Sequence, residues 1–111
     1  MLQRIQRVNQ LIKEQISQLI LKEIDFGSVL VTVTEVDTAA NLSQSKIKIS
    51  VLPGEKSEQV MRILKRNVFR LQQVLNKRLA MRIVPKIKFV IDQTEAKAQR
   101  IEEILGQIKR D

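Results

Sequence analysis

The chain is a short, basic polypeptide of 111 residues that contains no Cys, His, Trp or Tyr. These absences exclude disulfide frameworks, thiol nucleophiles, His-ligated metal centres and Ser-His-Asp triads. Twenty Lys and Arg residues against twelve Asp and Glu leave a net charge of +8, which favours a polyanionic partner.

The first 24 residues predict an amphipathic helix. Arg4 and Arg7 give this segment some likeness to an organellar transit peptide, but Glu14 and Glu23 argue against a removable presequence. We therefore expect the segment to be part of the fold of a cytoplasmic protein. Its apolar face is formed by residues spaced three and four apart: Ile5, Val8, Ile12, Ile16 and Leu19.

Two strands are predicted next along the chain. Residues 29–36 read VLVTVTEV, which is rich in β-branched residues and alternates as a half-buried strand does. Residues 45–52 read SKIKISVL and alternate apolar with polar side chains, so they predict a second strand with one buried face. A turn over residues 38–41 would join the two into a hairpin.

Residues 57–82 return to a helical period, over a length that is unusual for one globular helix. The apolar stripe consists of Met61, Leu64, Val68, Leu71, Leu75 and Leu79. If this helix is straight, Phe69 lies among arginines, where its ring could stack on a nucleobase. If it bends near Asn67, a residue that tolerates the left-handed conformation, Phe69 turns into the core. We favour the bend.

A third strand and a last helix complete the predicted order. Ile87, Phe89 and Ile91 alternate with lysines after Pro85. A capping box formed by Asp92 and Glu95 would start a C-terminal helix over residues 94–109. The order predicts an α+β fold in a single domain, 1–111, with a three-stranded sheet packed against helices. No run of 18 uncharged apolar residues occurs, so we expect no membrane span.

The excess positive charge is concentrated in the central helical region. Residues 55–85 carry eight basic and two acidic side chains, a balance of +6. At 100° per residue, Arg62, Arg66, Arg70 and Lys77 fall within an arc of roughly 80° opposite the apolar stripe. Such an arc suits phosphates, although a solvated charged face is the simpler alternative. The candidate RNA-binding residues are Arg62, Lys65, Arg66, Arg70, Lys77, Arg78, Arg82, Lys86 and Lys88.

The acidic residues and glycines indicate neither catalysis nor a cofactor. Glu35 and Asp92 lie at a predicted strand end and helix start, where an acid has an ordinary turn or capping role. The three glycines are isolated, so no Gly-rich phosphate loop is present. We expect no enzyme activity, no cofactor and no metal.

Three segments in this order resemble the ribosome-binding factor A family, whose layout is the type II KH-like order α-β-β-α-α-β. They are RIQRVNQLIKEQISQLILKEI at 4–24, VTVTEVDTAANLSQSKIKISVL at 31–52 and MRIVPKIKFVIDQT at 81–94. Members carry a small-x-Gly break between the two central helices, and Asn67, Val68 and Phe69 correspond to it. The chain departs from the pattern in having Phe69 in place of Gly and Gln72 where Arg is common.

The resemblance implies a non-catalytic assembly factor that binds the immature small ribosomal subunit and its rRNA, and we expect it to be monomeric when free. Two alternatives remain open at this stage. One is a general KH-type RNA-binding module, which the absence of a GxxG loop disfavours. The other is a protein-interaction or dimerisation domain whose basic face is only solvated.

Overall fold

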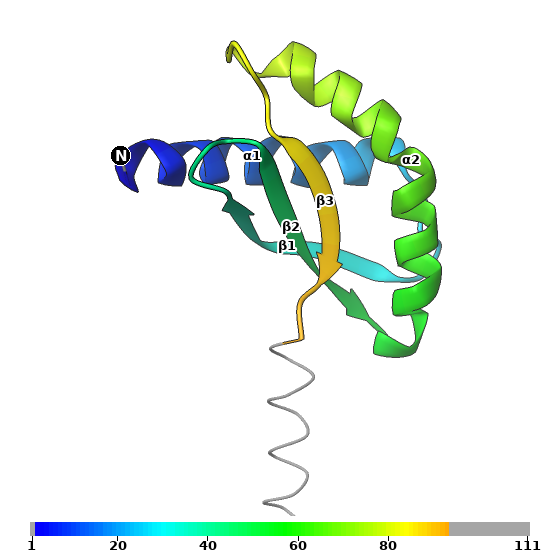
Figure 1. Ribbon diagram of the computed structural model, residues 1–111. Coiled ribbons are helices and arrows are strands. Elements are labelled where there is room, and N and C mark those ends of the chain that lie inside the picture. Colours follow the sequence, from blue (N-terminus) through cyan, green and yellow to red (C-terminus); the bar gives the residue numbers. More distant parts are fainter. Residues whose placement is uncertain (1, 94–111) are drawn as a thin grey trace, which may run out of the picture.

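The computed structural model describes residues 2–93, which form two helices, a short 3-10 turn and a three-stranded sheet (Figure 1). The α+β class and the three-stranded sheet predicted from the sequence are confirmed. The C-terminal helix predicted over residues 94–109 lies outside the described residues. So does Glu95 of its capping box.

Helix α1, Leu2–Glu23, carries the predicted apolar stripe into the core. Ile12, Ile16 and Leu19 are completely buried, whereas Ile5 is half-buried. The chain leaves the helix through Gly27, whose φ of 72° lies in the left-handed region that favours glycine. The amide of Gly27 donates to the Asp25 side chain at 2.8 Å, which fixes the turn into the first strand.

The sheet has the order β1-β2-β3. Strands β1, Leu30–Thr38, and β2, Gln44–Leu52, are antiparallel, as the predicted hairpin requires. Strand β3, Lys86–Ile91, lies parallel to β2 at the sheet edge. A register shift between Val33 and Glu35 marks a bulge in β1, which keeps Val33 and Val36 on the same buried face.

One face of the sheet is buried under the two helices, and the other is open. In Figure 1, α1 passes behind the sheet and α2 stands beside β3. The core of the buried face consists of aliphatic side chains and Phe89. Phe26 packs partly against it. Phe89, on the apolar side of the alternation predicted for the third strand, is therefore buried, and Phe26 is partly buried.

Helix α2, Ser57–Arg78, corrects the predicted order in one respect. It is a single helix, so the sequence order within residues 2–93 is α-β-β-α-β and the two central helices are one. It changes direction along its length (Figure 1), but the helix continues through Asn67, Val68 and Phe69. The Asn67 side chain donates to the carbonyl of Ile63 at 2.7 Å. Asn67 therefore bonds back to its own helix and does not terminate it.

Gln72 joins α2 to the free edge of β3. Its amide nitrogen donates to the Pro85 carbonyl at 3.0 Å, and its amide oxygen accepts the Ile87 N–H at 2.8 Å. The side chain thus takes the place of a neighbouring strand for one peptide step. This pair of bonds fixes how α2 lies against the sheet, and with it the orientation of the helix's outer surface.

Candidate nucleic-acid interface

The outer face of α2 is predominantly basic. Val60, Leu64, Leu71 and Leu75 anchor the opposite side of the helix in the core. Arg62, Lys65 and Arg66 are exposed, and within residues 2–93 no hydrogen bond or ion pair holds any of the three. Their charges are therefore available to a ligand. We refer to Arg62, Lys65 and Arg66 as the α2 cation cluster.

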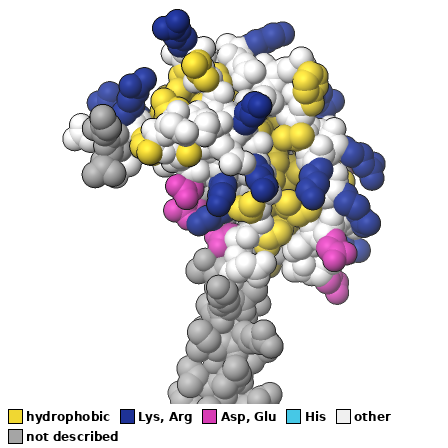
Figure 2. Space-filling model, in the orientation of Figure 1, with side chains coloured by type: hydrophobic (Ala, Val, Ile, Leu, Met, Phe, Trp, Pro, Cys, Tyr) yellow, Lys and Arg dark blue, Asp and Glu magenta, His cyan; other side chains and the backbone are white. Residues whose placement is uncertain are grey.

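Figure 2 shows the distribution of charge on this side of the molecule. Lys and Arg side chains lie over α2 and around β3, with hydrophobic side chains between them. Acidic side chains occupy only two small areas of the view. A large field of one sign attracts polyanions and is weakened by salt.

Arg70, which the sequence places in the same arc, has a structural partner. Its guanidinium donates to the Glu23 carbonyl at 3.3 Å and to the Asn67 side chain at 3.1 Å. The Glu23 carbonyl is one of the last of α1, where a positive charge interacts favourably with the helix dipole. Arg70 therefore connects the end of α1 to α2 and is less free to move toward a ligand than the α2 cation cluster.

The C-terminal end of α2 extends the positive charge toward α1. Lys77 is exposed, and Arg78 donates to the Gln15 side chain of α1 at 3.2 Å. Arg82 follows in the loop and lines a hollow of about 480 Å³ beside Arg4 and Arg7 of α1. The sequence offered no reason to place Arg4 and Arg7 near Arg82, because each of them is 75 or more residues away from Arg82 in the chain.

Lys86 and Lys88 lie on the open face of the sheet. Lys88 is opposite Lys46 of β2, and Lys46 is opposite Asp37 of β1. Lys48 is the next β2 residue on the same face. Its ammonium donates a hydrogen bond to the Glu35 carboxylate at 3.1 Å, and this ion pair raises the pKa of Lys48 above its ordinary value. The open face is thus acidic along β1 and basic along β2 and β3.

Phe69 is where the preferred prediction from sequence is wrong. Its side chain is 73% exposed on α2, whereas the bend predicted at Asn67 would have buried it. The helix continues through this segment, so the phase set by Leu64 and Leu71 is kept. That phase turns Phe69 about 140–160° away from both leucines at 100° per residue, which is the solvent side.

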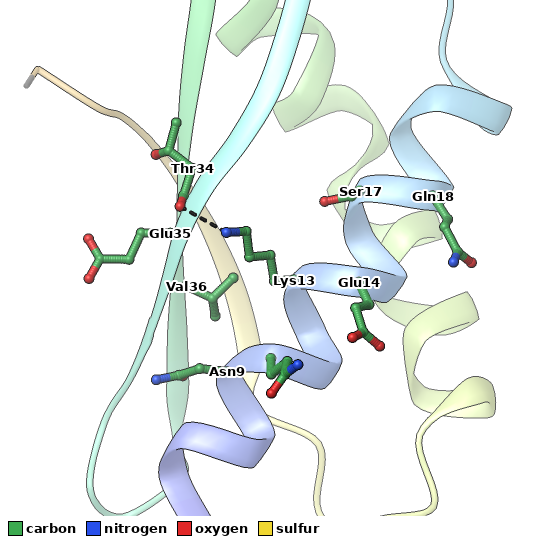
Figure 3. Close-up of a pocket in the computed structure, with 9 residues that line it drawn as sticks. Asn9, Lys13, Glu14, Ser17, Gln18, Thr34, Glu35 and Val36 are labelled. Carbon is green, nitrogen blue, oxygen red and sulfur yellow. Dashed lines mark hydrogen bonds between the residues drawn. The ribbon is translucent and has the colours of Figure 1, made fainter. Parts of the chain in front are cut away.

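A second hollow, of about 710 Å³, lies between α1 and β1 (Figure 3). Lys13 reaches across it from α1 and donates to the Thr34 carbonyl at 3.2 Å. Glu14 and Glu35 also line it, and the buried Asn9 Oδ1 has no hydrogen-bond partner among the described atoms. Positive and negative groups are mixed here, so this hollow does not resemble the predominantly basic surface of α2.

Metal and membrane sites are not found in the described part of the chain. Among residues 2–93, no group of three or more acidic side chains is placed to hold a metal ion. No helix in the same range is long and apolar enough to cross a membrane. Asp92 accepts a hydrogen bond from the Thr34 hydroxyl at 2.6 Å, so its carboxylate ties the end of β3 to the β1 bulge.

Known proteins resemble this chain over nearly its whole length. The sequence profile of the family described as ribosome-binding factor A matches residues 4–105. A ribosome-binding factor A of Coxiella burnetii is 32% identical over 100% of this chain and 95% of its own. That of Thermodesulfovibrio yellowstonii is 32% identical over 96% of this chain and 92% of its own.

Solved structures agree with this likeness at the level of the fold. The crystal structure of ribosome-binding factor A from Thermus thermophilus superposes with a TM-score of 0.69 at 23% identity, covering 78% of this chain and 93% of that one. A homology model of the Thermus thermophilus factor, fitted into a cryo-EM map of its complex with 30S, gives a TM-score of 0.60 at 24% identity. It covers 75% of this chain and 89% of that one.

Proposed function

This chain belongs to the ribosome-binding factor A family, and we propose from that membership that it binds the immature small ribosomal subunit and contacts its rRNA late in maturation. The Thermus thermophilus relative fitted into a map of a 30S complex supports the choice of the small subunit. The proposed role is binding without catalysis, carried out in the cytoplasm by a protein that is monomeric when free.

The α2 cation cluster is the observation that carries the rRNA part of the proposal. Three exposed cations on two successive turns, with no acidic partner in the described structure, can each neutralise a backbone phosphate. A surface that serves only for solubility generally mixes signs, because neighbouring opposite charges stabilise the helix. On α2, acidic residues are confined to its first turn, at Glu58.

The remaining candidates fall into two ranks by their contacts. Lys77, Arg82, Lys86 and Lys88 are exposed and extend the surface. Arg70 and Arg78 are each bonded to α1, so a phosphate would have to share them with the fold. We therefore assign the principal phosphate contacts to Arg62, Lys65 and Arg66, and secondary ones to the others.

Co-sedimentation with purified subunits tests this proposal directly. We expect the protein to pellet with immature small subunits and to remain in the supernatant with mature ones. Equal binding to both, or to any structured RNA, would favour a general RNA-binding module. If the protein pellets with neither and sediments alone as a dimer, the basic surface is a solvated face of an interaction domain and the proposal fails.

A further inference from the structure

Phe69 is an exposed aromatic side chain next to exposed cations on α2. It is one of three aromatic residues in the chain, and the other two lie in or against the core. A single exposed apolar side chain is ordinary on a protein surface. Of the large hydrophobic side chains in α2, however, Phe69 is the only exposed one, and the positions one helical turn before it are the cations Lys65 and Arg66.

Helix geometry places the ring over the α2 cation cluster. Residues three and four apart on a helix are surface neighbours, which makes Arg66 and Lys65 the residues next to Phe69. A helical side chain leans toward the N-terminus and covers the turn before its own Cα. The ring of Phe69 therefore lies above the turn of Lys65 and Arg66, where its edge and face are open to a ligand bound by those cations.

The combination of ring and cations specifies a ligand class. Lys and Arg bind backbone phosphates of any sequence, whereas an exposed aromatic ring stacks on a base that is not already stacked within a duplex. We propose that Phe69 is a base-stacking contact and that α2 binds a stretch of RNA with at least one unpaired nucleotide, whose flanking phosphates lie on Lys65 and Arg66.

This inference rests on the proposed function, since it names the form of RNA that the same surface binds. A partner protein is the competing occupant. An apolar protein partner would be expected to meet a cluster of exposed hydrophobic side chains, and charged residues are depleted at the centre of such interfaces. Phe69 is the only exposed large hydrophobic side chain of α2, and the neighbouring Lys65 is of a residue type depleted at protein interfaces, so the surface favours nucleic acid.

A fluorescence experiment tests the stacking itself. Because the chain has no Trp, Phe69→Trp introduces a single indole fluorophore at the site. The probes are single-stranded oligoadenylate about ten nucleotides long, within the usual site size for single-strand binders, and a duplex of the same length. We expect the single strand to quench the Trp emission and the duplex to leave it unchanged. Absence of quenching by the single strand would overturn the inference.

An affinity experiment on immature small subunits separates stacking from charge. Phe69→Ala should weaken binding about 5- to 150-fold at fixed salt, the range for loss of one stacked base. The salt dependence of binding should stay unchanged, because no phosphate contact is removed. Leu21→Ala is the matched control, since Leu21 is an equally exposed large apolar side chain, at 75%, that belongs to α1 and not to α2. We expect no change for it.

Phe69→Leu distinguishes the two occupants. Leucine keeps the apolar volume but has no aromatic face, so a stacking contact should weaken nearly as much as in Phe69→Ala. Full affinity of Phe69→Leu together with weak binding of Phe69→Ala would assign the contact to an apolar protein pocket and reject stacking. If the wild-type chain fails to bind immature subunits, the proposed function fails. If the wild-type chain binds them and the Phe69 variants bind equally well, the proposed function stands and the stacking inference fails.

Discussion

One pair of polar side chains lies on the buried face of the sheet. Thr38 and Ser45 face each other across β1 and β2, and they are 5% and 0% exposed. Their hydroxyl oxygens are 2.7 Å apart, so one donates to the other. Buried hydroxyl groups are tolerated only when they are hydrogen-bonded, which makes each residue dependent on its partner.

Removing one hydroxyl of this pair should lower the free energy of unfolding more than removing both. Ser45→Ala leaves the Thr38 hydroxyl buried without its partner, and we expect the free energy of unfolding to fall by about 1–3 kcal/mol. The double variant Thr38→Val with Ser45→Ala should recover part of that loss, since neither polar group remains. Urea unfolding of the two single variants and the double variant measures the coupling. Strict additivity would show that the hydroxyls do not depend on each other.

Leu71 is the corresponding test of the apolar core. It is completely buried on α2, so Leu71→Ala removes methyl groups and leaves a cavity, at an expected cost of about 2–5 kcal/mol. The exposed Leu21 of α1 is the control, and Leu21→Ala should change stability by no more than about 0.5 kcal/mol. A loss well below about 1 kcal/mol for Leu71→Ala, measured in urea, would contradict the orientation of α2.

At the scale of elements, α2 is held in place from both of its neighbours. Gln72 bonds it to the edge of β3, and Arg70 bonds it to the last turn of α1. Edge strands expose unpaired backbone groups that invite pairing with other chains. Gln72 satisfies two of these groups at the start of β3, the Pro85 carbonyl just before the strand and the Ile87 N–H within it, so it both orients α2 and protects one peptide step of the edge.

Gln72→Ala should loosen this contact locally. It removes the acceptor for the Ile87 N–H and the donor to the Pro85 carbonyl, and we expect a loss of about 1–3 kcal/mol in stability. Hydrogen exchange of the Ile87 amide should become faster at the same time. The adjacent exposed Gln73 provides the control, because Gln73→Ala removes a side chain of the same chemistry on the outer side of the helix. Equal exchange at Ile87 in both variants would show that the Gln72 bonds do not persist in solution.

At the scale of the whole molecule, the charge is arranged in separate groups. The α2 cation cluster lies on one surface, Arg4 and Arg7 border the hollow near Arg82, and the lysines of β2 and β3 lie on the open side of the sheet. Net charge alone would attract RNA to all of them. A specific interface requires that one group contribute more to binding than an equal charge elsewhere.

Salt titration of two double variants tests this arrangement. Arg62→Gln with Arg66→Gln removes two phosphate contacts, so the slope of log affinity against log salt should become shallower by about 1.4–1.8 units. Both side chains are exposed, and we expect the variant to fold normally. Arg4→Gln with Arg7→Gln removes the same charge from α1 and should leave the slope nearly unchanged. Equal effects of the two variants on binding to immature subunits would show that only net charge matters.

The sequence by itself determined α1, the three strands and the buried sides of the elements within residues 2–93, because these follow from short-range periodicity. The spacings of Ile12, Ile16 and Leu19 predict which side of α1 is buried, and the alternation in residues 45–52 predicts the buried face of β2. The exposure of Arg62 and Arg66 follows from the same phase. Periodicity also shows that the cations of α2 form one arc, which is how the candidate interface could be predicted at all.

Only the tertiary structure decided what the side chains of α2 contact and whether the helix breaks. The partner of Arg70 lies 47 residues away in the sequence, and that of Arg78 lies 63 residues away. No local pattern encodes such pairs, because they arise when separate elements pack. The continuity of α2 at Asn67 has the same origin: a residue able to break a helix does not do so when the leucines on both sides are buried in one core. That continuity leaves Phe69 on the surface, beside the cations that the sequence had already placed there.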